Sequence, residues 1–314
     1  MNIAYRFRIY PTEEQKILLG KTFGCCRFLY NQMLDDKIRE YEKTKKMLKN
    51  TPAMYKREYL FLKEVDSLAL ANVQLHLEKA YKNFFRDPKI GFPRFKSKHH
   101  SRNSYTTNVV NGNILVESKK IRLPKLKWIS MKKHREPAEG LRLKSVTVSM
   151  EPSGKYFASL LYEGYSCENQ AAEPDYSTAK ILGIDYAMQG MAVFSEKIET
   201  EEAGFFRKNE KRLAREQRKL SRCVRGSHNY ELQKKKVARC HEKIRNRRRD
   251  HLHKLSRKIA DSYDAVAVED IDMKAMGQCL HFGKSVQDNG YGLFRKMLDY
   301  KLAWQGKKMV KVDR

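Results

Sequence analysis

The segment AVAVEDIDMK (265–274) is an apolar run that stops abruptly at acidic residues. Small and branched apolar residues of this kind are typical of a buried strand, which here would deliver Glu269 and Asp270 at its end. A second segment, KILGIDYAMQGMAVF (180–194), has the same pattern, because its apolar run ends in Asp185. The two segments predict neighbouring strands that bring carboxylates together from distant parts of the chain.

Paired carboxylates of this kind suit phosphoryl transfer with divalent metal ions. Oxygen ligands bind Mg²⁺, and two ions about 3.5 to 4 Å apart can stabilise the attacking and leaving oxygens. Each acid alone could be a solvated turn residue, but a strongly basic chain favours a nuclease site. Successive strand residues point to opposite faces, so only one of Glu269 and Asp270 can meet Asp185. Spacing leaves the choice open, with Asp272 as a further competitor.

The charge balance indicates a polyanionic partner. The 314 residues include 65 Lys and Arg against 37 Asp and Glu, a formal net charge of +28, and 41% are hydrophobic, enough for a folded core. Nucleic acid is the first candidate and an anionic membrane the rival. No apolar run reaches the roughly 18 residues of a spanning helix, and no signal peptide opens the chain. We therefore expect a soluble, cytoplasmic nucleic-acid-binding protein.

Much of this charge falls between the two acidic strands. Residues 207–258 hold 21 Lys or Arg and 5 Asp or Glu, in two expected helices split by RGSHN (225–229). The second helix has an apolar stripe of Val237, Cys240, Ile244, Leu252, Leu255 and Ile259. Because the charge is one-sided, we favour nucleic-acid contact over an ordinary solvated face. Three histidines of this hairpin (His228, His251 and His253) are expected at the surface. The candidate nucleic-acid contacts of the hairpin are Arg218, Lys219, Arg222, Arg245, Arg248 and Lys254.

The first hundred residues predict one strand followed by helices. Alternation of Tyr5, Phe7 and Ile9 indicates the strand, and Thr12 with Gln15 has capping-box spacing. Apolar residues then recur every three or four positions, as in one long amphipathic helix, at Leu19, Phe23, Cys26, Tyr30, Leu34, Ile38 and Tyr41. Further helices are expected over 54–64 and 66–86.

Short strands dominate residues 103–163. They are SYTTN (104–108), NILVES (113–118), IRLPKLKWI (121–129), RLKSVTVSM (142–150) and KYFASLLYE (155–163), with a hairpin turn at EPSG (151–154). With the first strand they would close a small barrel. The expected fold is therefore α+β and multi-domain: a barrel from 1–10 and 101–165, an inserted helical domain over 11–100, a polar linker over 166–179, and a third domain over 180–314.

A basic aromatic segment precedes the barrel strands. GFPRFKSK (91–98) mixes rings with cations, as segments that stack bases and hold phosphates do, although it could equally be a surface loop with two anchoring phenylalanines. Its candidate contacts are Phe92, Arg94, Phe95, Lys96 and Lys98, to which Arg6 and Arg8 of the first strand are added.

The six cysteines (Cys25, Cys26, Cys167, Cys223, Cys240 and Cys279) form no C-x-x-C pair and are expected to be reduced core thiols, without zinc.

These segments together resemble a known family, the TnpB (OrfB) proteins of insertion sequences, which are compact RNA-guided DNA nucleases related to type V CRISPR effectors. The matching segments include YRFRIYPTEEQ, FGCCRFLYN, GFPRFKSK, IRLPKLKWI, LGID, KLSRCVRGSHN and LHKLSRKIADSYDAVAVEDI, in family order across nearly the whole chain. The resemblance implies a wedge-type barrel interrupted by a helical recognition bundle, then a RuvC nuclease domain of RNase H-like fold. It also implies Mg²⁺, a guide RNA from the element, and a target DNA with a short adjacent motif.

By this resemblance, Asp185 corresponds to the first RuvC aspartate and Glu269 to the catalytic glutamate. The family pattern continues past a strand like KMVKVDR into a zinc ribbon and a third aspartate, whereas this sequence stops at Arg314. A guided DNA-binding protein with an incomplete nuclease site is therefore the leading expectation. Two further hypotheses are an active nuclease with a substitute ligand (Asp270, Asp272 or Asp288) and a guide-free nucleic-acid binder that assists transposition. The family is often labelled transposase, but the sequence gives no separate evidence of strand transfer.

Overall fold

The computed structural model describes residues 2–98, 100–164, 178–187, 191–198, 204–271 and 290–312. The chain divides into two compact units, residues 1–165 and 166–314, which are described separately. Across the described ranges, every helix is either too short or too polar to cross a membrane.

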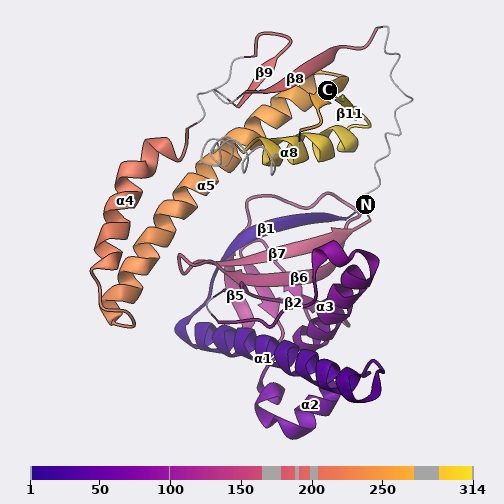
Figure 1. Cartoon of the computed structure of the whole chain (residues 1–314), viewed down its shortest axis with the longest axis vertical. Helices are drawn as coiled ribbons and strands as arrows, with labels where there is room; N and C mark the ends of the chain where they lie inside the picture. The colour runs from indigo at the N-terminus through magenta and orange to yellow at the C-terminus, as the bar shows by residue number, and fades with distance from the viewer. Residues whose placement is uncertain are drawn as a thin grey trace. The chain divides into compact units, whose positions relative to one another are not determined.

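The first unit is built on a seven-stranded antiparallel sheet (Figure 1). Its strands follow the order β2-β6-β7-β1-β5-β4-β3, so the first strand of the chain lies in the middle. They are β1 (Ile3–Tyr10), β2 (Asn103–Asn108), β3 (Leu115–Val116), β4 (Lys120–Leu123), β5 (Lys127–Lys132), β6 (Arg142–Met150) and β7 (Tyr156–Glu163). The predicted strands at 2–10, 104–108, 142–150 and 155–163 are confirmed. No ladder joins edge strands β2 and β3 in the described residues, so a closed barrel stays a prediction.

The helices of this unit lie between β1 and β2 in the chain, as predicted. They are α1 (Glu13–Thr44), α2 (Pro52–Glu58), η1 (Leu60–Glu64), α3 (Ser67–Arg86) and η2 (Pro88–Ile90). The capping box is confirmed, because Thr12 accepts from the Gln15 amide while Gln15 accepts from the Thr12 amide. Apolar residues of α1 and α3, such as Leu29 and Leu70, form one buried cluster with Phe7 and Leu160 of the sheet.

Four expectations about this unit are wrong in detail. IRLPKLKWI is two strands, because Lys125 and Lys127 take left-handed φ values of 64° and 58° and turn the chain between β4 and β5. NILVES contributes only the two residues of β3, and the helix expected over 54–64 is split into α2 and the 3-10 segment η1. The apolar stripe of α1 ends before Tyr41, which is 49% exposed.

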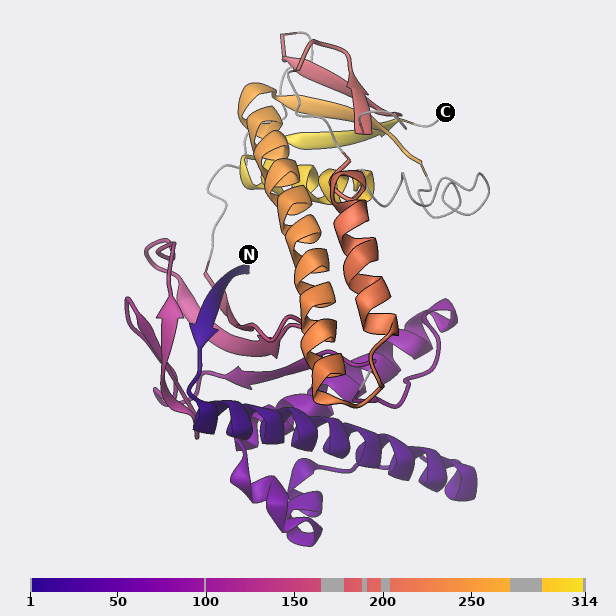
Figure 2. The same ribbon diagram turned by 90° about the vertical axis from the view of Figure 1, so that its left-hand side faces the viewer.

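The second unit contains a four-stranded sheet in the order β11-β10-β8-β9. Strands β8 (Ile181–Ala187), β10 (Ala265–Glu269) and β11 (Lys308–Val312) are parallel, and β9 (Met191–Phe194) pairs antiparallel to β8. Helices α4 (Arg207–Ser221) and α5 (His228–Ser262) form the predicted basic hairpin, and α8 (Tyr291–Trp304) connects β10 to β11 (Figures 1 and 2). The expected linker, over 166–179, lies almost wholly outside the described residues.

One face of this sheet carries the core of the unit. Leu182 and Ile184 of β8 and Val266 and Val268 of β10 are buried. They belong to one apolar cluster with Leu252, Leu255 and Ile259 of α5 and Phe294, Met297, Leu298 and Leu302 of α8. The cluster therefore fixes which face of the sheet the helices cover.

Gln15 connects the start of α1 to the turn between β4 and β5. Its side-chain Nε2 donates to the carbonyls of Leu126 and Trp128, both at 2.9 Å. Because these bonds are lost together with half of the capping box, Gln15→Ala should lower the free energy of unfolding by about 2 kcal/mol. Gln32→Ala, which removes one bond to Asp36 within α1, should cost less than about 0.5 kcal/mol. Urea denaturation measures both values, and equal losses would contradict this role of Gln15.

Candidate metal and nucleic-acid sites

Parallel pairing of β10 with β8 brings Glu269, the last residue of β10, next to Asp185, which lies two residues before the end of β8 and not at its end as predicted. Val268 stands opposite Ile184, and Glu269 and Asp185 are the next residues of the two strands. Their neighbours on the outer strands are Val193 of β9, opposite Asp185, and Val312 of β11, opposite Glu269. The carboxylates therefore sit side by side across the two central strands.

The same register decides which face these carboxylates occupy. Ile184 and Val268 are buried against α5 and α8, so the residues that follow them point to the opposite face. Asp185 is exposed and Glu269 half-buried there. The residues opposite them, Val193 and Val312, are 59% and 51% exposed. The carboxylate pair thus lies on the accessible face of the sheet.

The side chain of Tyr291, at the start of α8, is buried within electrostatic range of both carboxylates. Burial raises the pKa of Tyr291, nearby Arg295 lowers it, and the charges of Asp185 and Glu269 raise it further. The residue is 1% exposed, and its hydroxyl has no hydrogen-bond partner among the described residues. Its ring packs edge-on against Tyr186 at 5.2 Å. Both carboxylates therefore act electrostatically on one buried group.

Asp270, which competes with Glu269 in the sequence, is engaged elsewhere. Its two carboxylate oxygens lie 3.2 Å from Arg295 of α8 and 3.2 Å from Lys311 of β11. Using it as a metal ligand would mean breaking these ion pairs. Asp272 and Asp288, which were also candidate ligands, lie outside the described residues. Within the described ranges, no three His, Cys, Asp or Glu side chains gather in a metal-binding group.

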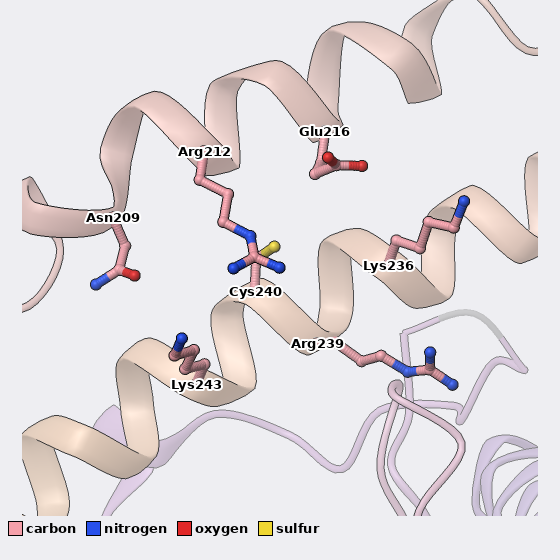
Figure 3. A pocket seen from close by; sticks show the side chains of 7 residues that line it. All are labelled: Asn209, Arg212, Glu216, Lys236, Arg239, Cys240 and Lys243. Carbon is pink, nitrogen blue, oxygen red and sulfur yellow. The ribbon is translucent and has the colours of Figure 1, made fainter.

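A cationic groove runs between α4 and α5 (Figure 3). It encloses about 320 Å³, and residues of both helices face it. They are Asn209, Arg212 and Glu216 of α4 and Lys236, Arg239, Cys240 and Lys243 of α5. A second hollow of about 370 Å³ shares Arg212 and adds Lys211, Arg215 and Arg218. We call the first hollow the hairpin groove.

The single carboxylate of the hairpin groove is already engaged. Nε2 of the buried Gln233 donates to Glu216 Oε2 at 2.8 Å, and this bond lowers the pKa of Glu216. Arg215 approaches the same carboxylate at 3.6 Å. Within the described residues, the groove's four cations (Arg212, Lys236, Arg239 and Lys243) form no ion pair. The groove therefore presents unneutralised positive charge, which suits phosphate groups.

The hairpin residues predicted to contact nucleic acid lie in different environments. Arg218 lines the second hollow, and Lys219, Arg222 and Arg245 are exposed. Lys254 pairs with Asp250 at 2.8 Å. Arg248 is half-buried beside Gly290, where a Cβ would meet its Cδ at 3.0 Å and where φ is +69°. Both the close approach and the left-handed backbone require glycine at this position.

The predicted contact residues of GFPRFKSK also differ in environment: most are exposed, whereas one anchors the segment to α1. Phe92 and Phe95 are 44% and 55% exposed, and Arg94 and Lys98 are exposed. Lys96 instead anchors the segment to α1, because its backbone exchanges two hydrogen bonds with Asn31 and its Nζ lies 3.8 Å above the Tyr30 ring. Burial lowers the pKa of Lys96.

The expectations for cysteine and histidine are partly wrong. Cys25 and Cys26 are buried as predicted, and burial raises the pKa of Cys26 to about 12. Cys223, which lies between α4 and α5, and Cys240 of α5 are both partly exposed. Cys167 and Cys279 lie outside the described residues. His228 and His253 are exposed, whereas His251 is half-buried and packs against the Phe205 ring at 5.3 Å.

The groove cations Arg212, Lys236, Arg239 and Lys243 were not singled out from the sequence. A signal was present, because positions 236, 239 and 243 recur at helical spacing and so share one face of α5. Nothing local indicated that this face would lie against Arg212 of α4.

Sequence comparison gives two family matches and several relatives. Residues 164–279 match the OrfB family of IS605, described as "Probable transposase", and residues 1–46 match its "Helix-turn-helix domain". A "Putative RNA-guided DNA endonuclease" of Streptomyces pristinaespiralis is 32% identical over 99% of this chain and 77% of its own length. InsQ of Escherichia coli K12, with the same description, is 30% identical over 98% of this chain and 80% of its own length.

Comparison of folds gives a similar chain among solved structures. The protein in the structure titled "Cryo-EM structure of the Cas12f1-sgRNA-target DNA complex" aligns with a TM-score of 0.56 at 12% identity, over 100% of this chain and 89% of that chain. The likeness supports a shared mixed α/β fold. The helix-turn-helix description does not fit the described residues 2–46, where β1 is followed by the single long helix α1.

Cys240 provides a direct probe of the hairpin groove. In the free protein, iodoacetamide should modify Cys240 and Cys223, because both are partly exposed, and spare buried Cys25 and Cys26. Bound RNA should protect Cys240 and leave Cys223, which lies beyond the end of α4 and outside the groove, reactive. Mass spectrometry of the labelled peptides measures both rates. Equal labelling of Cys240 with and without saturating RNA would show that the groove stays empty.

Proposed function

Because this chain belongs to the TnpB (OrfB) family, we propose that it is an RNA-guided DNA-binding protein whose second unit carries a RuvC-like, Mg²⁺-dependent site at Asp185 and Glu269. The observation that carries the proposal is the register of β10 on β8, which supports a pairing of these two carboxylates on one accessible face. The names of the relatives, RNA-guided DNA endonucleases, point to the same chemistry.

The residues at this face suit a divalent cation. Two carboxylates supply the hard oxygen ligands that Mg²⁺ prefers, and the alternation of side chains along β10 supports Glu269, rather than Asp270, as the partner of Asp185. The buried hydroxyl of Tyr291 offers a further polar group nearby without a described partner. When bound, Mg²⁺ would supply charge stabilisation at a scissile phosphate. The protein's part is to hold the carboxylates rigidly on the two central strands and open to a nucleic-acid backbone.

Cationic surfaces of the chain would hold that backbone. Arg212, Lys236, Arg239 and Lys243 of the hairpin groove are free of ion pairs among the described residues, so phosphates can take those positions. In RNA-guided systems, base pairing reads the sequence while protein cations hold the strands. Guided recognition therefore needs no base-specific groove in the protein.

Binding and cleavage rest on different residues, so measuring both distinguishes a guided binder, an active nuclease and a guide-free binder. Guided binding depends on cations and base pairing, whereas cleavage depends on the metal ligands. The full chain, copurified with RNA from its native locus, is incubated with matched and mismatched DNA and Mg²⁺. Matched binding without cutting supports guided binding alone, and matched cutting supports an active nuclease. Equal affinity for unrelated RNAs would refute the guided function and favour a guide-free binder.

The metal site makes a prediction that does not depend on cleavage. Tb³⁺ bound between Asp185 and Glu269 should give tyrosine-sensitised luminescence, because Tyr186 and Tyr291 are close by. Asp185→Asn and Glu269→Gln should each weaken Tb³⁺ binding by at least about tenfold, since each removes a charged oxygen ligand. Any guided cleavage should fall by about 100-fold or more, with DNA binding retained.

A matched control for these substitutions is Asp299→Asn, which changes an exposed carboxylate of α8 in the same unit. It should leave both luminescence and nucleic-acid binding unchanged. Wild-type luminescence in the Asp185→Asn and Glu269→Gln variants would refute the metal site.

The hairpin groove predicts a graded salt dependence. Replacing Arg212, Lys236 or Lys243 by Gln should weaken RNA binding for all sequences and reduce the slope of log affinity against log salt by about one unit each. Lys49→Gln, at an exposed position of the first unit, is the control. Filter binding at several salt concentrations measures the slope. An unchanged slope in all three groove variants would exclude phosphates from the groove.

A further inference from the structure

The outward face of the seven-stranded sheet carries an aromatic ring among cations. Cross-strand partners share a face, so the register defines a row across five strands: Ser104, Ser149, Phe157, Arg8 and Lys132. The adjoining row is Thr106, Thr147, Ser159 and Arg6. The opposite face holds Phe7, Ala158 and Leu160 of the core. Neither outward row contains an aliphatic side chain, and Phe157 is the one aromatic side chain in the two rows.

The guanidinium of Arg6 lies over this ring and is also held by an ion pair. Its guanidinium carbon is 4.0 Å from the centroid of Phe157, and its Nη2 donates to Glu151 Oε1 at 2.6 Å. Glu151 is 8% exposed, so this ion pair is largely shielded from water. The side chain of Arg6 is nevertheless 34% exposed. A planar cation is thus fixed over a ring, with part of its surface open to solvent.

Further cations surround this stack with few acids to neutralise them. Arg8 lies 5.7 Å from the Phe157 centroid and 5.2 Å from that of Tyr10, and its buried Nε has no acceptor within the described residues. Arg102 approaches Glu151 at 3.6 Å and is 63% exposed. Lys132, opposite Arg8, is exposed. Glu151 therefore serves two arginines, and the surroundings keep a net positive charge.

An ordinary solvated strand face would not need this arrangement. Water-facing arginines usually keep their rotamer freedom, and fixing one over a ring costs side-chain entropy. Nucleic-acid-binding sheets, in contrast, use rigid rings and guanidinium planes as stacking surfaces, with cations nearby for the phosphates.

We propose that this face binds an unpaired nucleotide, with the base stacked on the Arg6–Phe157 pair and its phosphates held by Arg8, Arg102 and Lys132. The proposal rests on the function proposed above, since it assigns a place to a single-stranded part of either the guide RNA or the target DNA. Both sources share one chemistry, a base with its backbone phosphate, and the experiment distinguishes them.

The test uses the full chain and single-stranded oligonucleotides in which one uridine of the RNA is replaced by 5-iodouridine, or one thymidine of the DNA by 5-iodo-2′-deoxyuridine. Irradiation should crosslink the oligonucleotide to the peptide that contains Phe157. Parallel arms use the guide RNA and each strand of the target DNA, so the arm that crosslinks identifies the source.

Two substitutions test the stacking itself. Arg6→Lys keeps the charge and removes the plane, and Phe157→Leu keeps an apolar side chain and removes the ring. Each should weaken single-strand binding by about tenfold, with an unchanged salt slope because no charge is lost. Controls of the same type are Arg39→Lys, an exposed α1 residue paired with Asp35, and Phe61→Leu, 42% exposed. Both controls should bind as the wild type does.

The outcomes separate this inference from the proposed function. If the wild type binds matched DNA with its guide while both variants keep full affinity and no crosslink reaches Phe157, the stacking surface is refuted and guided binding stands. If guided binding fails in the wild type, the oligonucleotide titrations still decide whether the stacking surface exists. Thermal unfolding of each variant shows whether lost binding reflects lost folding, and a Phe157 crosslink in a wild-type complex would still support the surface.

Discussion

The parallel pairing of β10 with β8 is the constraint on which the rest of the second unit depends. It is held by burial of Leu182, Ile184, Val266 and Val268 against α5 and α8. Burying each such side chain is worth roughly 1.5 to 3 kcal/mol. Side chains alternate across a strand, so a slip of one residue would turn Glu269 toward the core and Asp270 toward Asp185. The apolar core therefore specifies which carboxylate is available to a metal, although none of these core residues could itself bind the metal.

The two halves of helix α5 differ in composition: one half packs in the apolar core, and the other carries the hairpin groove. Its C-terminal half is buried through Leu252, Leu255 and Ile259, and Lys301 of α8 holds it by donating to the His253 carbonyl at 2.6 Å and to Ser256 Oγ at 2.8 Å. Its N-terminal half carries the hairpin groove, where apolar burial is sparse. A helix polar on most sides gains little from propensity alone, so anchoring one end in a core stabilises the cationic end.

The two units use cations in different ways. In the hairpin groove, Arg212, Lys236, Arg239 and Lys243 have no described ion-pair partner, so their charge is free to act on a polyanion. On the sheet of the first unit, Arg6 is instead fixed by a buried carboxylate and an aromatic ring. The first arrangement favours affinity that depends on salt, and the second favours a defined geometry.

The sequence by itself determined those features whose signals are local. The strands at 142–150 and 155–163, the capping box of Thr12 and Gln15, and the strand that ends in Glu269 each depend on signals within a few residues and were predicted correctly, whereas β8 continues past Asp185 to Ala187. The turn within IRLPKLKWI was missed, because its left-handed positions are Lys125 and Lys127 and not glycine, the residue that usually indicates such a turn. Only the tertiary structure decided that Glu269 shares a face with Asp185, that Asp270 pairs with Arg295, and that Arg212 faces α5 across the hairpin groove. Each of these depends on a strand register or a packing contact between residues distant in the chain. Neither segment has a sequence pattern of its own that indicates such a contact.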